Sequence, residues 1–204
     1  MAVTDQDRRV DERRVTPVSG VADPGPLGLA AFAMTTFVLS VFNAKLIATG
    51  EGVVLGLALF YGGTAQLLAG MWEFKNNNTF GATAFTSYGA FWLSFWYLNV
   101  HTNLSTAKGH DATHAVGVFL VAWAFFTAYM LIASLRTTVA IIAVFLTLTI
   151  TFILLAIGAF ADKPGWTQAG GWAGLVTAAV AWYASFAAVT NATFKRTVLP
   201  VIPR

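Results

Sequence analysis

"NNNTFGATAFTSYGAFWLSFWYL", residues 76–98, is the stretch that decides the fold. Residues 79–98 contain no charged side chain and are rich in aromatic rings, as in a segment that crosses a membrane. The same residues also include several hydroxyl groups and many small side chains. Small and hydroxyl-bearing residues commonly pack helices together within lipid, whereas a pore would need them for its polar lining. The stretch therefore predicts a membrane helix and leaves open what its hydroxyl-bearing face meets.

The composition of the whole chain indicates a protein that is embedded in lipid. Of its 204 residues, 57% are hydrophobic and 10% are charged, and its mean hydropathy is +0.68. A soluble domain carries about 25% charged residues. The chain has no cysteine, which excludes disulfides and thiolate metal sites. Its net charge of +3 comes from cations in loops and at the ends, so membrane topology explains it better than nucleic-acid binding.

Six segments are long and apolar enough to cross the hydrocarbon core, which takes about 20 residues. They cover residues 27–47, 52–71, 79–98, 114–135, 138–161 and 168–190. We therefore expect an all-α membrane protein with a six-helix domain over residues 23–195. A disordered tail, residues 1–22, precedes this domain, and a short tail, residues 196–204, follows it.

The distribution of Lys and Arg predicts the orientation. One side of the predicted membrane holds nine of the twelve cations: Arg8, Arg9, Arg13, Arg14, Lys75, Arg136, Lys195, Arg196 and Arg204. The other side holds three: Lys45, Lys108 and Lys163. Because cytoplasmic loops carry the excess of cations, both termini are expected in the cytoplasm of a cell-membrane protein.

The second predicted helix combines glycines with polar side chains on one face. Gly62, Gln66, Gly70 and Glu73 share that face, and Gly62 and Gly63 lie at mid-membrane, where paired glycines weaken a helix. Two interpretations remain open. Either the glycines allow close helix contact and Gln66 bonds to a neighbour, or the weakened helix lines a pathway.

Three stretches resemble a known family. They are "DPGPLGLAAFAMTTF" (residues 23–37), "FYGGTAQLLAGMWEFKNNNTFGATAFTSYGAFWLS" (residues 60–94), and the later "LLAIG" (154–158) with "FKRTVLP" (194–200). They resemble the acetate uptake transporter family, which includes bacterial succinate–acetate permeases and fungal acetate transporters. The resemblance implies six spans, a homohexamer with one pathway per protomer, passage of acetate and some succinate, and no cofactor. The chain departs from the family signature at Asp23 and Gly25, where the signature has Asn and Ala.

The resemblance also implies a narrow hydrophobic gate formed by Phe32, Tyr88 and Leu148. At 100° per residue, Tyr88 points away from the hydroxyl stripe, so the two cannot both face one thin pore in a straight helix. We therefore expect the stripe to pack against neighbouring helices and the aromatic face to meet the substrate. The stripe comprises Thr79, Thr83, Thr86, Ala90 and Ser94.

Neutral donors are expected to hold a small carboxylate, because no Lys or Arg lies at mid-depth in a span. The candidates are Thr36, Asn43, Gln66 and Tyr88, together with Asn78 and Thr79 at the start of the third helix, where free N–H groups attract anions. Glu73 has two interpretations, an ion pair with Lys75 or Arg136, or a proton-responsive group at the inner mouth.

Other functions have less support in the sequence. There is no P-loop, dinucleotide fingerprint or nucleophile signature, so we expect no enzyme. His110 and His114 lie one turn apart, but too few ligands surround them to predict a metal site. A non-transporting membrane sensor or assembly protein remains the alternative. Within transport, the sequence does not separate a channel from a proton symporter.

Overall fold

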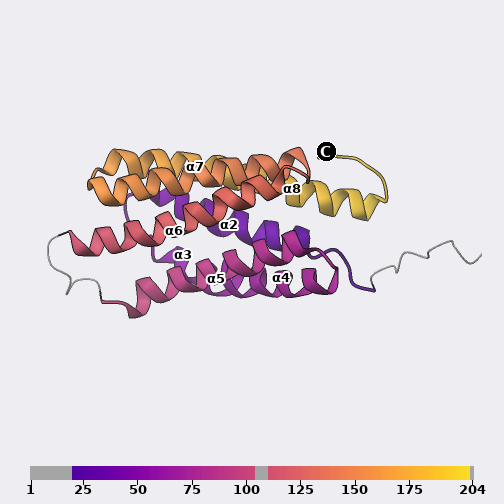
Figure 1. Cartoon of the computed structure of the whole chain (residues 1–204), viewed down its shortest axis with the longest axis horizontal. Coiled ribbons are helices and arrows are strands. Elements are labelled where there is room, and N and C mark those ends of the chain that lie inside the picture. Colours follow the sequence, from indigo (N-terminus) through magenta and orange to yellow (C-terminus); the bar gives the residue numbers. More distant parts are fainter. Residues whose placement is uncertain (1–19, 104–109, 203–204) are drawn as a thin grey trace, which may run out of the picture.

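The computed structural model describes residues 20–103 and 110–202. Within these residues the chain forms six long helical segments that run along its longest dimension (Figure 1). The first is α2 (Gly25–Asn43), and the second joins α3 (Val53–Leu59), the π-helical η1 (Phe60–Ala65) and α4 (Gln66–Lys75). The others are α5 (Thr79–His101), α6 (Asp111–Ser134), α7 (Val139–Ala161) and α8 (Pro164–Phe194). The predicted all-α fold is confirmed, whereas residues 1–19 of the predicted disordered tail lie outside the described residues.

Five of these segments are long and apolar enough to cross a membrane by length and composition, among the residues described. The exception is α5, which has 23 residues but is not one of the five. Its hydroxyls, together with its Tyr and Trp rings, lower its mean hydropathy. Residues 79–98 thus belong to a helix of spanning length whose composition is only partly that of a lipid-facing span.

Two helices differ in length from the predicted ones, and backbone geometry explains both differences. The first helix ends at Asn43 rather than at residue 47, and Lys45 just beyond it has a φ of 59°. The last helix has 31 residues and begins at Pro164, whose fixed φ suits a first helical turn. It ends at Phe194, and Lys195 just beyond it has a φ of 54°. A residue with a left-handed backbone conformation ends a helix because it turns the chain away from the helix axis.

Small residues bring the helices into close contact. α2 packs mainly against α8, and α7 packs against both α6 and α8. Gly171 of α8 lies against the backbone of Ala44, so even a methyl group would clash there. The backbones of α5 and α6 approach each other less closely, and aromatic rings fill the space between them. The ring centroids of Phe91 and Phe119, for example, are 5.6 Å apart.

The hydroxyl stripe of α5 lies away from the centre of the bundle. Thr86 packs against Gly70 of α4, where an added methyl group would collide with the Thr86 hydroxyl. Ala90 and Ser94 lie farther along and are exposed on the surface of the chain. Tyr88, by contrast, is buried in the central apolar cluster with side chains of α2 and α7. Helix geometry thus separates the two faces of α5, as the sequence predicts.

Candidate functional site

Two cavities lie at opposite ends of the helix bundle and share two lining residues. The first, of about 350 Å³, is lined by residues that include Glu73, and we call it the Glu73 cavity. The second, of about 280 Å³, is lined by residues that include Trp92, and we call it the Trp92 cavity. Phe32 of α2 and Leu148 of α7 line both cavities. Each volume is several times the ~30 Å³ that one water occupies in the liquid, so each cavity has room for a small molecule with some hydration.

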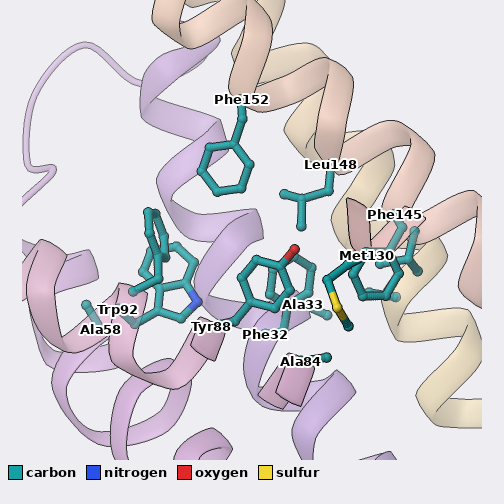
Figure 2. Packing of buried hydrophobic residues seen from close by; sticks show 13 residues of the cluster. Phe32, Ala33, Ala58, Ala84, Tyr88, Trp92, Met130, Phe145, Leu148 and Phe152 are labelled. Carbon is teal, nitrogen blue, oxygen red and sulfur yellow. The ribbon is translucent and has the colours of Figure 1, made fainter. Parts of the chain in front are cut away.

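The residues between the cavities form a closed apolar neck. Phe32, Tyr88 and Leu148 are 4%, 3% and 3% exposed. The ring centroids of Phe32 and Tyr88 are 5.7 Å apart. Figure 2 shows the Leu148 side chain pointing from its helix toward these two rings. The three residues that the family resemblance names thus meet in space, although α7 offers no polar signal that would identify Leu148.

Thr127 of α6 holds Tyr88 in place. The Tyr88 hydroxyl lies 2.9 Å from Thr127 Oγ1, and Thr127 is itself fully buried. Because Thr127 donates its own proton to the carbonyl of Trp123 at 2.7 Å, Tyr88 must be the donor in this pair. The Tyr88 proton is therefore already engaged in this structure, and a role for Tyr88 as a donor to substrate stays a prediction. Sequence reasoning missed Thr127, whose only signal is a hydroxyl in the apolar middle of α6.

The paired glycines widen the second helical segment without opening it. Gly62 and Gly63 lie in the π-helical turn η1, whose backbone hydrogen bonds join residues five apart rather than four. A methyl group on Gly62 would come within 2.5 Å of Thr35 Oγ1 on α2, so close helix contact requires a glycine there. The turn leads directly into Gln66, the first residue of α4, which lines the Glu73 cavity. Each interpretation of the glycines therefore has support in the structure. The glycines allow close helix contact, and the turn that contains them precedes an amide that lines a cavity.

Unpaired buried polar atoms concentrate on the two cavities. In the described part of the chain, four buried side-chain atoms lack a hydrogen-bond partner: Thr36 Oγ1, Gln66 Oε1, Thr86 Oγ1 and Trp92 Nε1. Gln66 lines the Glu73 cavity, and Thr36 and Trp92 line the Trp92 cavity. A buried polar group without a partner is costly, and such groups often serve a bound molecule. Trp92 was missed as a candidate, although it lies one turn after Tyr88 on the same face.

The remaining neutral candidates differ in position. Asn43 lines the Trp92 cavity near the end of α2. Asn78 lines the Glu73 cavity, but its amide is already engaged at the start of α5, where its Oδ1 accepts the N–H of Gly81 at 3.0 Å. Thr79 is exposed and lines neither cavity. Of the two residues that were predicted to bind an anion at this helix start, Asn78 therefore lines the cavity and Thr79 does not.

Glu73 is buried and bonded to a neutral partner. Its side chain is 1% exposed, and Asn78 Nδ2 donates to its Oε2 at 3.0 Å. Among the described residues, neither Lys75 nor Arg136 forms an ion pair with it. The ion-pair interpretation of Glu73 is therefore not supported. Asn78 both caps α5 and orients this carboxyl group.

The segment after α8 folds back onto the bundle. Asn191 Oδ1 accepts the N–H groups of Val198 and Leu199, and its Nδ2 donates to the carbonyl of Leu199 at 2.8 Å. Val201 then reaches the lining of the Glu73 cavity. Asn191 has no periodic signal in the sequence that would identify these contacts, because its partners follow the helix in an irregular segment.

Residues 10–203 match the family described as GPR1/FUN34/yaaH. The chain belongs to this family. The match covers all the described residues and extends into the N-terminal region. It includes every residue of the two cavities and the neck.

Similar proteins are found in yeast and bacteria. The ammonia transport outward protein 2 of Saccharomyces cerevisiae is 43% identical over 184 residues, which cover 86% of this chain and 64% of the yeast protein. The succinate-acetate/proton symporter SatP of Escherichia coli K12 is 41% identical over 181 residues, which cover 89% of this chain and 95% of SatP. The chain spans about two thirds of the length of the yeast relatives it matches.

A solved structure has the same fold. The structure of the bacterial acetate channel SatP matches with a TM-score of 0.81 at 40% sequence identity. The match covers 89% of this chain and 99% of that one. Together with the apolar helices, this likeness shows an all-helical, multi-pass membrane protein with a SatP-like fold.

Proposed function

We propose that this protein transports acetate and similar small monocarboxylates, with some succinate, through a pathway that joins the two cavities. The observation that carries the proposal is the pair of cavities that meet at Phe32 and Leu148. The names of the bacterial relatives, a succinate-acetate/proton symporter and an acetate channel, support this substrate class. A pathway within one chain also distinguishes a transporter from the alternative, a membrane sensor or assembly protein that moves no substrate.

The gate in this proposal is the apolar neck of Phe32, Tyr88 and Leu148. An apolar constriction hinders the passage of ions by excluding water, and small movements of its side chains admit water and substrate. A two-carbon acid presents a single methyl group to such a neck, whereas a larger acid must displace more side-chain atoms. The width of the neck therefore favours two-carbon acids over larger ones.

Neutral groups hold the substrate on either side of the gate. Thr36 and Asn43, with Trp92, face the Trp92 cavity, and Gln66 and Asn78 face the Glu73 cavity. Thr79 contributes only through the helix start it shares with Asn78. None of the described residues that line these two cavities is a Lys, Arg or His. A fixed cation would hold an anion firmly, so its absence from these linings suits a small acid that must leave as readily as it binds.

Glu73 is the proton-linked group in this proposal. It lines its cavity beside Asp23, and the amides of Asn78 and Asn76 also face it. A buried carboxyl group with neutral hydrogen-bond partners can exchange a proton with an acid in the same cavity. The replacement Glu73→Gln should then leave acetate uptake responsive to voltage but no longer driven by a proton gradient.

The proposed assembly is a homohexamer with a pathway in each protomer, whose transport domain covers residues 23–195. Both cavities are lined by one chain, so no pathway between protomers is required. The exposed small side chains of Thr79, Ala90 and Ser94 provide a surface on which helices of two protomers can pack closely. Light scattering of the detergent-solubilised protein measures the mass of the assembly, and a monomer would contradict the hexamer.

The proposed location is the cell membrane, with both termini in the cytoplasm. Nine of the twelve cations support this orientation. A reporter that is active only in the cytoplasm, fused to the C-terminus, tests it directly.

Uptake by proteoliposomes tests the function. Labelled acetate, succinate and ammonium are offered separately under imposed pH and voltage gradients, with protein-free liposomes as the blank. The variant Leu68→Ala, on the exposed face of α4, is the matched control. We expect acetate uptake above the blank, and accumulation against its electrochemical gradient, driven by a proton gradient, would identify a symporter. Uptake of ammonium without acetate would assign a different substrate, and uptake of neither would refute transport.

A further inference from the structure

Two carboxyl groups flank the mouth of the Glu73 cavity. Asp23 precedes α2, and its Oδ1 accepts the N–H of Gly25 at 2.9 Å. A methyl group placed on Gly25 would lie 3.0 Å from Asp23 Oδ1 and 3.5 Å from Glu73 Oε1. The two oxygens, one from the exposed Asp23 and one from the buried Glu73, therefore border the same small volume. Both residues line the cavity.

Within the part of the chain that the structure describes, no positive side chain lines the cavity beside these carboxyl groups. The other polar side chains that line it, within the described residues, are the neutral Gln66, Asn78, Tyr88, Thr137 and Thr138. The described cations at this end of the bundle are exposed and lie outside the lining: Lys75, Arg136, Lys195 and Arg196. Among the described residues, a substrate at this lining therefore meets carboxyl groups without a cation beside them.

We propose that Asp23 is a specificity-determining residue that disfavours dicarboxylates relative to monocarboxylates at this mouth. The inference rests on the transport function proposed above. Repulsion is proportional to the charge of the substrate, so a dianion is repelled twice as strongly as a monoanion. A unit charge about 5 Å away in water changes affinity about fourfold for each charge on the substrate. Removal of the Asp23 charge should therefore favour succinate over acetate by about threefold to fivefold.

The variant Asp23→Asn isolates the charge from the local structure. Asn has nearly the same shape, and its side-chain oxygen can still accept the N–H of Gly25. The variant and the wild type are compared in proteoliposomes at about pH 7.5, well above the usual range for carboxylic acids, where succinate carries two charges and acetate one. The readout is the ratio of labelled succinate uptake to labelled acetate uptake. Glu51→Gln is the control, because Glu51 is exposed at the other end of the bundle and outside both cavities.

Ionic strength gives a second readout that needs no variant. The Debye length falls from about 30 Å at 0.01 M salt to about 3 Å at 1 M. The succinate-to-acetate ratio of the wild type should therefore rise with salt, and that of Asp23→Asn should rise less. A ratio that neither Asp23→Asn nor salt changes, in protein that transports acetate, would overturn the inference, as would an equal loss of both substrates in the variant. Wild-type protein that transports no acetate would refute the proposed function and remove the basis of this inference with it.

Discussion

Replacement of Gln66 by Leu should stabilise the protein while it impairs transport. The side chain is 1% exposed, and its Oε1 has no hydrogen-bond partner among the described residues. A buried polar atom without a partner costs about 1–3 kcal/mol, and Leu has a similar volume without that atom. The free energy of unfolding should therefore rise by about 1 kcal/mol, whereas most substitutions of buried residues lower it.

The same replacement removes the Nε2 amide of Gln66, which we propose donates a hydrogen bond to the substrate carboxylate. A hydrogen bond to a charged group contributes about 1.5–3 kcal/mol, which corresponds to about tenfold or more in binding. Acetate uptake by Gln66→Leu should fall by at least that factor. Thermal unfolding of the purified protein measures the first effect, and labelled acetate uptake by proteoliposomes measures the second.

Thr177→Val is the matched control, because its result should have the opposite pattern. Thr177 is fully buried and lines neither cavity, and its hydroxyl donates to the carbonyl of Ala173 at 2.9 Å. Its Oγ1 also lies 3.3 Å from that of Thr151, which lines the Trp92 cavity but keeps its own bond to the carbonyl of Thr147 at 2.9 Å. Loss of the bond to Ala173 should lower stability by about 1 kcal/mol and leave acetate uptake intact. The reasoning is refuted if Gln66→Leu is destabilised by more than about 1 kcal/mol and still takes up acetate at the wild-type rate, because Gln66 would then be a packing residue.

Three further variants probe the neck and its supports. Leu148→Ala should widen the neck and raise lactate uptake relative to acetate, at a cost of about 2–5 kcal/mol in stability; an unchanged ratio would exclude Leu148 from the gate. Tyr88→Phe should keep acetate uptake, because the ring and not the hydroxyl forms the neck, while the loss of the bond to Thr127 lowers the melting temperature. Asn191→Ala should release residues 198–199, so limited proteolysis should cut there sooner than in the wild type, and equal cutting rates would argue against that contact.

The helices could be predicted from the sequence because their signal is local. A run of about 20 apolar residues crosses a bilayer whatever surrounds it, and an uncharged stretch such as residues 79–98 already has the required length. The two faces of α5 also follow from helix geometry, which places Tyr88 away from the hydroxyl stripe. The glycine pair in the second segment marked a disturbed turn, although its form, a π-helix rather than an unwound helix, depends on contacts with α2.

The candidate site could be predicted only in part, because most of its contacts join residues far apart in the chain. Thr127 lies 39 residues after Tyr88, and no local pattern connects them. Leu148 belongs to an apolar face that by itself predicts contact with lipid or core. Glu73 could have been paired with a nearby cation, and only its burial beside Asn78 decides against that.

The amino-acid sequence by itself determined that this chain is a bundle of apolar helices whose central part lacks fixed cations. These properties depend on the composition and the periodicity of each segment, and both can be read from one helix without its neighbours. Only the tertiary structure decided that side chains from α2, α5 and α7 meet to separate two cavities, and that unpaired polar atoms face those cavities. Such features arise where different helices come together. The free energy of helix packing decides how they come together, and it depends on several segments at once.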